Sequence, residues 1–502
     1  MTDLQDPRHV IPGTGLNVGS VTVAALRAAM ESGALTPAAL TDYYLRRIDR
    51  LNPALHAVIT VNPDAVREAS IVPDGPLSGI PVLVKDNIGV AGIPTTAGSP
   101  ALLSSVVQDA FGVSKLRAAG AVILGKANLS EWANFRSSHS TSGWSTLGGQ
   151  TVNPYALDRN PSGSSSGSAA GVAAGLAPLA VGTETDGSIV APASACGVVG
   201  IKPTSGLISR RGIVPISPVQ DTAGPMAGCV ADAAVLLSVL AGPDPEDPIY
   251  PEQQWEPRSL LSSLDRGLID GARLAIWRQP TADAPPAVRA VLDMAVARMR
   301  SLGAIVDDPV DLPGVSEIGE PEFAAMLYEF KYGINAYLAY VASVAGFTGP
   351  STLAELIDFN KRNADLVLPR FGQDIFEQAE ATSGALDDPA YVALRRSATS
   401  LARSSLSVLS DSCDAVVSLT AGPAWLTDYV LGDRADFGSS SPAAVAGYPA
   451  ITVPAGYVSG LPVGITFTGA RWSEPRLLAL AYAFEQSSPV RHPPALAATA
   501  TV

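Results

Sequence analysis

The chain has 502 residues, of which 47% are apolar and only 16% are charged. Such a composition can fill a large core and argues against a disordered chain. The formal net charge is -14 and there is no long basic run, which argues against sequence-independent binding to nucleic acid, because that binding requires clustered lysine and arginine.

The first predicted elements are two helices within residues 21–52, the second of which begins after Thr36 and Pro37. Threonine can cap the first turn of a helix, and proline suits its first position. From about residue 79, short apolar strands alternate with helices, a pattern that favours a sheet with helices on its faces. The strands predicted here are 79–84, 121–124 and 179–183, and the helices are 109–119 and 168–177.

In the second half of the chain, a further unit is predicted to start near 273–277 and is followed by a helix at 287–302. Six apolar residues of this helix share one face, namely Val288, Val291, Leu292, Ala295, Val296 and Met299. Residues 320–410 are predicted to be mostly helical. The remaining predicted elements are strands at 414–420, 450–454 and 463–468, a helix at 474–486 and a frayed tail at 493–502.

Residues 79–228 carry most of the chemical information. They contain GIPVLVKDNIGVAGIPT, NPSGSSSGSAAGVAAG and AVGTETDGSIVAPASACGVVGIKPT. Glycine and serine cluster twice between apolar segments, which is typical of a backbone that turns tightly and exposes hydroxyl groups. A flexible linker is the alternative interpretation, but two linkers between buried strands and helices are not expected in one compact block.

A serine nucleophile needs a base, which is usually histidine. The chain has four histidines. His9 and His492 lie near the termini, His56 lies in an apolar segment that suggests a core position, and His139 lies in the polar loop SSHSTSG. We therefore expect none of the four to act as the base.

Lysine is the other candidate for a base. Lys85 follows the apolar run 80–84, which could draw its side chain into the core. At an ordinary pKa of about 10.4, only about 0.04% of lysine is neutral at pH 7, but burial can lower this pKa by several units. Arginine could not take this role, because its pKa is too high. Taken alone, the segment also fits a lysine that faces solvent beside Asp86.

These segments resemble the amidase signature family, whose hallmark is a Ser–cis-Ser–Lys triad. Lys85 matches the lysine of the family's G-x-P-x-x-x-K segment, and Ser164 in SGSSSGS matches the bridging serine. Ser188 in GTETDGSIV matches the nucleophile and follows Ser164 by 24 residues, which is the family's spacing. The likeness extends to GIKPTSGLISRRG, AVAGYPAITVPAG, GLPVGITFTG and LLALAYAFEQ, and is weakest at 245–410.

The resemblance implies an acyl-enzyme mechanism. Neutral Lys85 would accept a proton through Ser164 from Ser188, whose oxygen attacks the carbonyl carbon of an amide. The Gly163–Ser164 peptide is expected to be cis. The resemblance also implies an oxyanion hole made by backbone N–H groups. These belong to Thr185, Asp186, Gly187 and Ser188.

Two departures from the common family pattern bear on the substrate. Asp186 replaces a glycine, and Val190 replaces a frequent arginine that meets an acidic substrate group in some members. We therefore do not expect a small amide that carries a carboxylate. TETDGSIV, NLSEWANFRS and SGWSTLGGQTVNPY resemble the bacterial peptide amidase branch, which removes C-terminal amides from peptides. Aryl or alkyl amides, carbamates and esters remain alternatives.

Three rival interpretations fit the sequence less well. Gly120–Ala127 reads GAVILGKA and nearly matches a phosphate-binding loop, but its centre is strand-like and Ala127 lacks the hydroxyl group that a metal would need. Ser165 fits the G-x-S-x-G elbow of an α/β-hydrolase esterase, but a polar loop precedes it where a strand is required. The A subunit of a tRNA-dependent amidotransferase is disfavoured by the charge, by Val190 and by the divergent middle.

The family implies one large α/β/α domain over residues 1–502, with a central mixed sheet covered by helices. Its signature core is expected at about 70–235, a variable helical region on the substrate side at about 245–410, and a return to the sheet at about 411–487. We expect no metal and no organic cofactor, because protein groups supply the attack, the proton relay and the oxyanion contacts. The expected partner is a small-molecule or peptide amide, with no nucleic acid and no membrane, and the chain is expected to be a monomer or a homodimer.

The cysteines and the N-terminus bear on the compartment. Cys196, Cys229 and Cys413 lie far apart and show no CxxC spacing, which favours a reducing environment. The N-terminus shows no basic segment followed by an apolar one, and the longest apolar runs are too short to cross a bilayer. A cytoplasmic protein is expected.

Overall fold

The computed structural model describes residues 10–247, 249, 258–409, 413–434 and 437–500. Within these residues the centre of the molecule is an 11-stranded sheet in the order β1-β3-β2-β6-β8-β7-β12-β13-β11-β9-β10. Its strands are β1 (Val58–Val61), β2 (Pro81–Lys85), β3 (Val122–Ala127), β6 (Leu179–Glu184), β7 (Val199–Lys202), β8 (Thr222–Ala227), β9 (Arg273–Trp277), β10 (Ile305–Val310), β11 (Ala415–Leu419), β12 (Ala450–Val458) and β13 (Leu461–Thr468). A second, two-stranded sheet contains β4 (Trp144–Ser145) and β5 (Gly149–Gln150).

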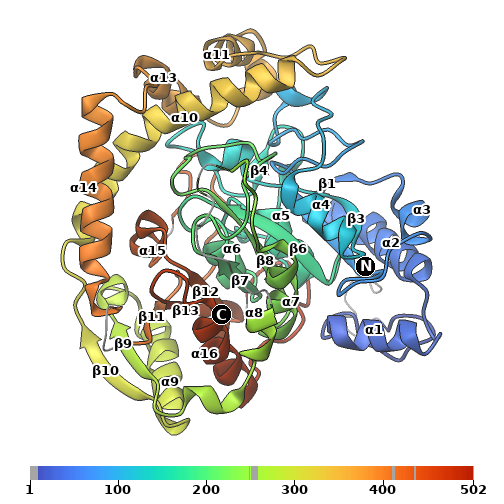
Figure 1. The fold of residues 1–502 in the computed structure, drawn as a ribbon, viewed down its shortest axis with the longest axis vertical. Coiled ribbons are helices and arrows are strands. Elements are labelled where there is room, and N and C mark those ends of the chain that lie inside the picture. The colour runs from blue at the N-terminus through green and yellow to red at the C-terminus, as the bar shows by residue number, and fades with distance from the viewer. Residues whose placement is uncertain (1–9, 248, 250–257, 410–412, 435–436, 501–502) are drawn as a thin grey trace.

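Helices cover this sheet on both sides (Figure 1). They are α1 (Val23–Glu31), α2 (Pro37–Leu55), α3 (Ala65–Ala69), α4 (Phe111–Ala118), α5 (Ser166–Ala173), α6 (Val190–Ala195), α7 (Val230–Leu240), α8 (Arg258–Ser262), α9 (Pro286–Ser301), α10 (Gly319–Ala342), α11 (Leu353–Arg362), α12 (Ala364–Val367), α13 (Asp374–Ala381), α14 (Pro389–Ser405), α15 (Ser441–Ala446) and α16 (Glu474–Ser487). The predicted fold class, a mixed sheet covered by helices, is confirmed.

The sheet is mixed because its strands run parallel only toward its two ends. β2 pairs in parallel with β3 and β6, and β9 pairs in parallel with β10 and β11. The strands between these groups pair antiparallel, and so does the edge strand β1 with β3. Val84 of β2 is in register with Val181 of β6, so the carboxyl ends of these two strands lie side by side. This register places Lys85, the last residue of β2, beside the end of β6.

Several predicted elements match closely. Thr36 caps α2 by accepting a hydrogen bond from the Ala39 N–H at 3.2 Å, and Pro37 is the first residue of the helix. The predicted face of α9 is buried at all six positions. This face packs against β12 and β13, because a helix with one apolar stripe must cover a sheet face or another helix.

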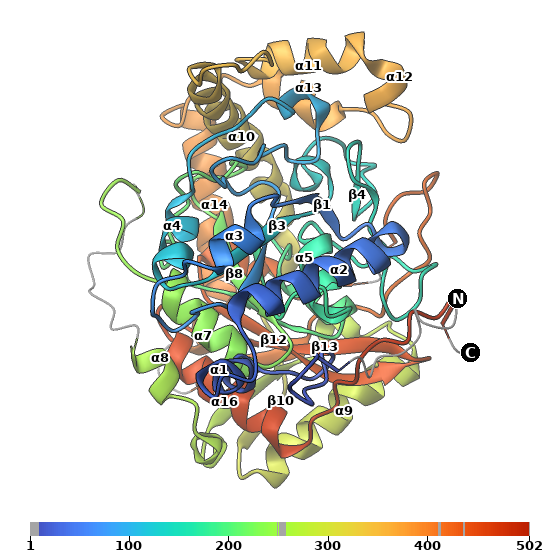
Figure 2. The same cartoon turned by 90° about the vertical axis from the view of Figure 1, so that its right-hand side faces the viewer.

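The predicted helical middle forms a cover beside the sheet. α10 and α14 run along the top and one side of the molecule, and α11 to α13 lie at the top (Figures 1 and 2). A second apolar cluster lies beneath this cover and includes Phe330 and Phe376, whose rings stack at 5.2 Å. In the described part of the chain, no helix is long and apolar enough to cross a membrane.

Two expectations are wrong. His56 is exposed and not part of the core, because it ends α2 in the left-handed conformation with φ of 49°, and its Nδ1 lies 3.1 Å from the Gly148 carbonyl oxygen. The described part of the tail is not frayed. Leu157 donates to the carbonyl of Ala497 at 2.8 Å, and Leu496 donates to the carbonyl of Pro154 at 3.1 Å.

Candidate active site

Lys85 lies at the end of β2 and is completely buried. Its Nζ contacts four oxygen atoms. Ser164 Oγ is nearest at 2.7 Å, Ser165 Oγ lies at 3.0 Å, and the hydroxyl and carbonyl oxygens of Thr183 lie at 2.9 and 3.2 Å. The register of β2 with β6 therefore brings the lysine amine to Thr183, and the segment before α5 supplies the two serine hydroxyl groups.

This burial changes the protonation of Lys85. Loss of solvent lowers the pKa of its amine to about 7, although the carboxylates of Glu184 and Asp221 favour the charged form. A lysine with this pKa is largely neutral above pH 7. The alternative interpretation of the segment, a lysine at a solvent-facing edge, is wrong.

Ser164 is completely buried and follows a cis peptide bond with Gly163, as the family resemblance implies. Gly163 has no room for a side chain, because an added Cβ would lie 2.3 Å from Ser130 Oγ. The Ser164 carbonyl accepts a hydrogen bond from the Ser130 N–H at 3.1 Å. The short segment that leads into α5 is thus fixed on both sides.

Ser165 is also completely buried, and its hydroxyl group is fully engaged. It donates to the Thr183 carbonyl at 2.9 Å and accepts from the Thr183 N–H at 3.1 Å, in addition to its contact with Lys85. No strand leads directly into it, since residues 160–165 belong to no strand or helix. These observations do not fit an esterase elbow. The Ser165 N–H donates to the Ser188 carbonyl at 3.1 Å, which holds Ser188 next to this segment.

Ser188 is partly exposed and lies in a turn that joins β6 to α6. Among the described residues, no protein acceptor receives a hydrogen bond from the backbone N–H groups of Asp186, Gly187 or Ser188. Gly187 has a positive φ of 77°, a conformation that favours glycine, and an added Cβ would lie 2.9 Å from Ser440 Oγ. The turn therefore presents several free donors beside a serine hydroxyl.

Two acidic residues for which the sequence predicted no role hold this turn. Glu184 Oε2 accepts from the N–H groups of Ile189 at 2.7 Å and Val190 at 3.1 Å. Burial raises the pKa of Glu184, while the charge of Lys202 opposes this rise. Asp221 accepts from the Thr185 hydroxyl at 2.6 Å, and burial raises its pKa to about 6. Glu184 lies in the GTETDGSIV segment just before the turn, whereas nothing in the sequence pointed to Asp221.

A cavity of about 300 Å³ adjoins the turn. Its walls combine small, polar and aromatic residues, namely Ser162, Gly163, Asp186, Gly187, Val190, Ala191, Thr420, Ala421, Gly422, Pro423, Trp425, Phe437, Gly438 and Ser440. Asp186 is held in this wall by the hydroxyl of Ser441, which donates to its Oδ2 at 2.5 Å. A smaller cavity of about 130 Å³ lies beside Asn87, Thr183 and Asp221.

The other candidate groups lie elsewhere. His56, His139 and His492 are exposed, and His9 lies outside the described residues. The GAVILGKA segment is largely strand β3, and its Lys126 is buried in an ion pair with Asp86 at 3.0 Å. The segment is therefore structural, as predicted.

Comparison with known proteins agrees with this geometry. The model of the amidase family matches residues 39–478. A probable amidase of Arabidopsis thaliana is 41% identical over 95% of this chain and 92% of its own length. The structure of native peptide amidase from Stenotrophomonas maltophilia matches with a TM-score of 0.88 and 44% identity, covering 97% of this chain and 99% of that one. The A subunit of the glutamyl-tRNA(Gln) amidotransferase from Symbiobacterium thermophilum is 33% identical over 91% of this chain and 94% of its own length. The chain belongs to the amidase family and is an amide-hydrolysing enzyme.

Proposed function

We propose that the enzyme cleaves amides through an acyl-enzyme on Ser188, with Ser164 as the proton relay and Lys85 as the base. The observation that carries this proposal is the buried Lys85 amine, which contacts the Ser164 hydroxyl at 2.7 Å and has a pKa lowered to about 7. Ser164 is next in sequence to Ser165, whose N–H binds the carbonyl of Ser188.

The contacts of Lys85 suit a neutral base. A neutral amine has two N–H groups and one lone pair. The Ser165 hydroxyl donates to the Thr183 carbonyl, so its oxygen accepts from Lys85. The second N–H of Lys85 has the Thr183 oxygens within reach. The lone pair is then free for the proton of Ser164, at the shortest of the four distances.

The proposed reaction uses this relay in both directions. Ser188 gives its proton to Ser164 as its oxygen attacks the amide carbon, and Ser164 gives its own proton to Lys85. The relay then returns a proton to the leaving amine. Water hydrolyses the acyl-enzyme by the same route. The backbone N–H groups of Asp186, Gly187 and Ser188, and with them that of Thr185, stabilise the negative oxygen that forms in each step.

We propose peptides with a C-terminal amide as the substrate class, with aryl or alkyl amides as the alternative. The similarity to a peptide amidase supports this choice. The cavity beside the turn also supports it, because Trp425 and Phe437 suit an apolar side chain and the described residues of its walls include no basic one. Asp186 in its wall disfavours an acidic substrate.

Active-site labelling and a substrate panel test this proposal. A fluorophosphonate probe is expected to modify Ser188, and mass spectrometry of the labelled peptide identifies the residue. The purified chain alone is expected to release ammonia from acylated dipeptide amides, and Ser188→Ala is expected to abolish this release. A matched variant, Ser166→Ala, retains labelling. Modification of Ser165, or turnover that survives Ser188→Ala, contradicts the proposal.

A further inference from the structure

Gln220 lies two residues before β8 and connects three parts of the molecule, although it is only 1% exposed. Its Nε2 donates to Glu322 Oε1 at 2.8 Å and to the Thr185 carbonyl at 3.3 Å. Its Oε1 accepts from Arg395 Nη1 at 2.6 Å. Because arginine only donates hydrogen bonds, the amide oxygen must face Arg395 and the amide nitrogen must face Thr185.

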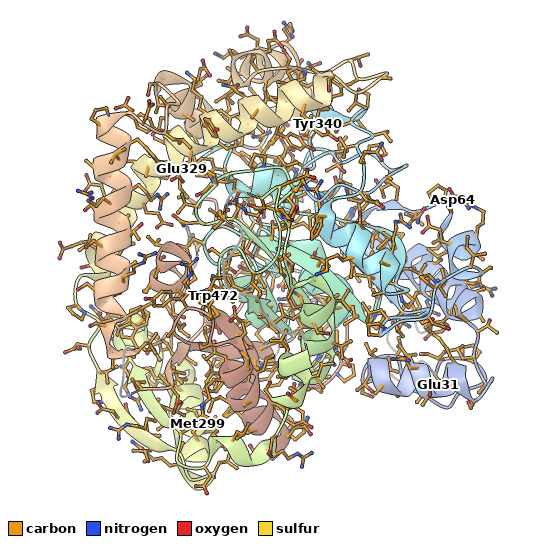
Figure 3. All side chains as sticks on the ribbon, viewed as in Figure 1. Glu31, Asp64, Met299, Glu329, Tyr340 and Trp472 are labelled. Atoms are coloured by element: carbon orange, nitrogen blue, oxygen red, sulfur yellow. The ribbon has the colours of Figure 1, made fainter. Side chains whose placement is uncertain are left out.

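The helical cover fixes the partners of Gln220. Arg395 of α14 binds Glu329 of α10 through two parallel bonds, from Nε at 2.8 Å and from Nη2 at 2.7 Å. The hydroxyl of Tyr391 donates to the same carboxylate at 2.8 Å. Figure 3 shows Glu329 where α10 comes next to α14. A bidentate pair of this kind has a fixed geometry, so Arg395 presents Nη1 to Gln220 in one position.

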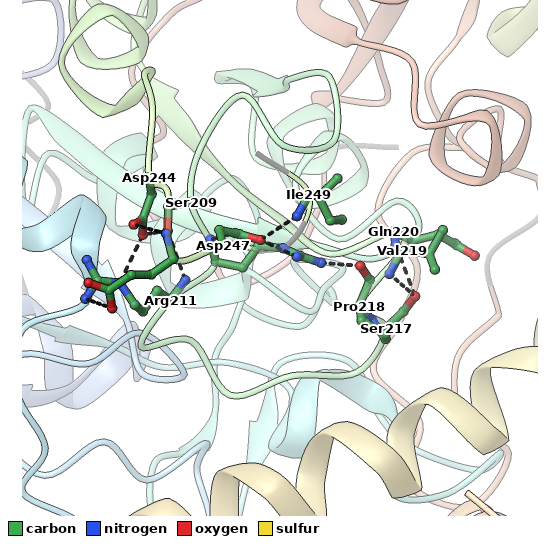
Figure 4. A network of polar contacts seen from close by, with 11 residues as sticks. Ser209, Arg211, Ser217, Pro218, Val219, Gln220, Asp244, Asp247 and Ile249 are labelled. Carbon is green, nitrogen blue, oxygen red and sulfur yellow. Dashed lines mark hydrogen bonds and ion pairs between the residues drawn. The ribbon is translucent and has the colours of Figure 1, made fainter. Parts of the chain in front are cut away.

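The backbone of Gln220 is held independently from the other side. Ser217 Oγ accepts from the N–H groups of Val219 at 3.2 Å and Gln220 at 3.0 Å, and Figure 4 shows this turn. The guanidinium group of Arg210 pairs with Asp247 and donates to the Pro218 carbonyl in the same turn. The side chain of Gln220 thus reaches the Thr185 carbonyl from an anchored position.

The contact with Thr185 sets the direction of a neighbouring N–H group. In a trans peptide unit the carbonyl and the N–H point in opposite directions. The Thr185 carbonyl points to Gln220, so the N–H of Asp186 points away from Gln220, and it has no protein acceptor in the described part of the chain. If this peptide unit flipped, it would present a carbonyl oxygen where a donor is needed.

We propose that Gln220 is a positioning residue that keeps the Asp186 N–H directed at the negative oxygen formed during amide cleavage, and that Arg395 holds Gln220 for this role. The inference rests on the proposed function. It links the variable helical cover to the reaction, because the donor in the turn depends on contacts made by α10 and α14.

Gln220→Met tests the inference, since methionine keeps the length of the side chain but removes the amide. We expect kcat to fall about 10- to 100-fold and KM to change less than about threefold, because an oxyanion contact acts mainly in the transition state. The affinity for a peptide aldehyde, which forms a tetrahedral adduct, is expected to fall by the same factor as kcat. The affinity for the peptide acid product is expected to remain. Tyr391→Phe is the matched control, because it removes one hydrogen bond at the far end of the network and leaves the Arg395–Glu329 pair.

Different outcomes would contradict the inference on Gln220 and the proposed function. If Gln220→Met keeps kcat within about twofold, or loses kcat while retaining aldehyde affinity, Gln220 does not position a donor. If Gln220→Met does not fold, Arg395→Lys decides, because it keeps a charge beside Glu329 but withdraws the donor from Gln220. It should lower kcat and aldehyde affinity together, and an unchanged kcat overturns the inference. A wild-type enzyme that is not labelled at Ser188 overturns the proposed function itself.

Discussion

The protonation of Lys85 sets the pH range in which the proposed relay can work. Burial lowers the pKa of this amine to about 7, and only the neutral amine can accept a proton. We therefore expect kcat/KM for a peptide amide to rise about tenfold per pH unit below pH 6.5 and to level off above pH 8. Rates measured from pH 5 to 9 with an uncharged substrate check this. A profile that stays flat or falls between pH 6 and 8 contradicts Lys85 as the base.

The same pKa predicts how Lys85 affects stability. Its folded pKa of about 7 lies below the ordinary 10.5, so the unfolded chain binds the additional proton between these two values. The contribution of Lys85 to the free energy of unfolding therefore increases with pH across this window, by about 1.4 kcal/mol per unit. We expect Lys85→Met to be more stable than the wild type at pH 6 and to lose this advantage steadily toward pH 10. Urea unfolding at four pH values measures the difference, and a constant difference means that the buried amine stays charged.

For single residues, the sequence predicted the burial of Lys85 but not the groups that contact its amine. The apolar run before it and the family motifs indicated a buried amine near Ser164. Its contacts with Ser165 and Thr183 could not be predicted, because they join residues 80 and 98 positions apart. Thr183 looked like an ordinary strand residue. Only the folded structure reveals that both of its oxygens face the lysine.

Among the helices and strands, those with a strong hydrophobic pattern could be predicted from the sequence. Those that depend on tertiary contacts could not. The stripe of α9 follows from its sequence, whereas β8 has the sequence TAGPMA, in which glycine and proline disfavour a strand. β8 nevertheless pairs on both sides, with β6 and β7. Gly224 is needed there because an added Cβ would lie 2.0 Å from the Ile201 carbonyl oxygen. The contact that requires this glycine cannot be seen in the sequence.

The start of helix α1 depends on a residue of α7. The carboxylate of Asp232 accepts from the N–H of Val23, the first residue of α1, at 3.1 and 3.2 Å. Asp232→Ala would leave this buried donor without a partner, at a cost of about 1–3 kcal/mol. We expect faster amide hydrogen exchange in residues 23–31 and unchanged kcat, because α1 lines neither of the two cavities beside the site.

Asp64→Ala is the matched control for this variant. Asp64 is exposed and pairs with Arg67 three residues later, and exposed pairs of this kind contribute little. In Asp64→Ala, the amide hydrogen exchange of α1 should equal that of the wild type. If Asp232→Ala also leaves the exchange of α1 unchanged, the carboxylate does not hold the helix.

On the scale of the whole molecule, the sequence indicated the sheet and the helical middle but not how they join. Gln220 reaches Arg395 across 175 positions, and Arg136 reaches the Phe371 carbonyl across 235 positions. In each contact at least one partner lies on an irregular segment, where no periodic pattern marks it. They decide where the helical cover sits, and the cover in turn borders the site.

Substitution of Arg136 tests how the helical cover is joined to the rest of the molecule. It is completely buried, pairs with Glu131 at 2.5 Å, donates to the Val367 carbonyl at 2.9 Å, and lies 4.2 Å from the ring of Phe371. Arg136→Met leaves the Glu131 carboxylate buried without its counterion. We expect the free energy of unfolding to fall by about 3–5 kcal/mol, as measured by guanidinium titration.

A double variant distinguishes two causes of the lost stability: the loss of the Arg136–Glu131 ion pair, and the buried charge left on Glu131. Adding Glu131→Gln to Arg136→Met removes the buried charge, so the double variant should be more stable than Arg136→Met alone. The exposed pair of Arg46 with Asp42 supplies the control, and Arg46→Met is expected to cost less than about 1 kcal/mol. If the effects of the two buried substitutions on the free energy of unfolding are additive, the Glu131 carboxylate is not destabilised by the loss of Arg136. The joint between the sheet and the helical cover then depends on the apolar and carbonyl contacts of Arg136, and not on its charge.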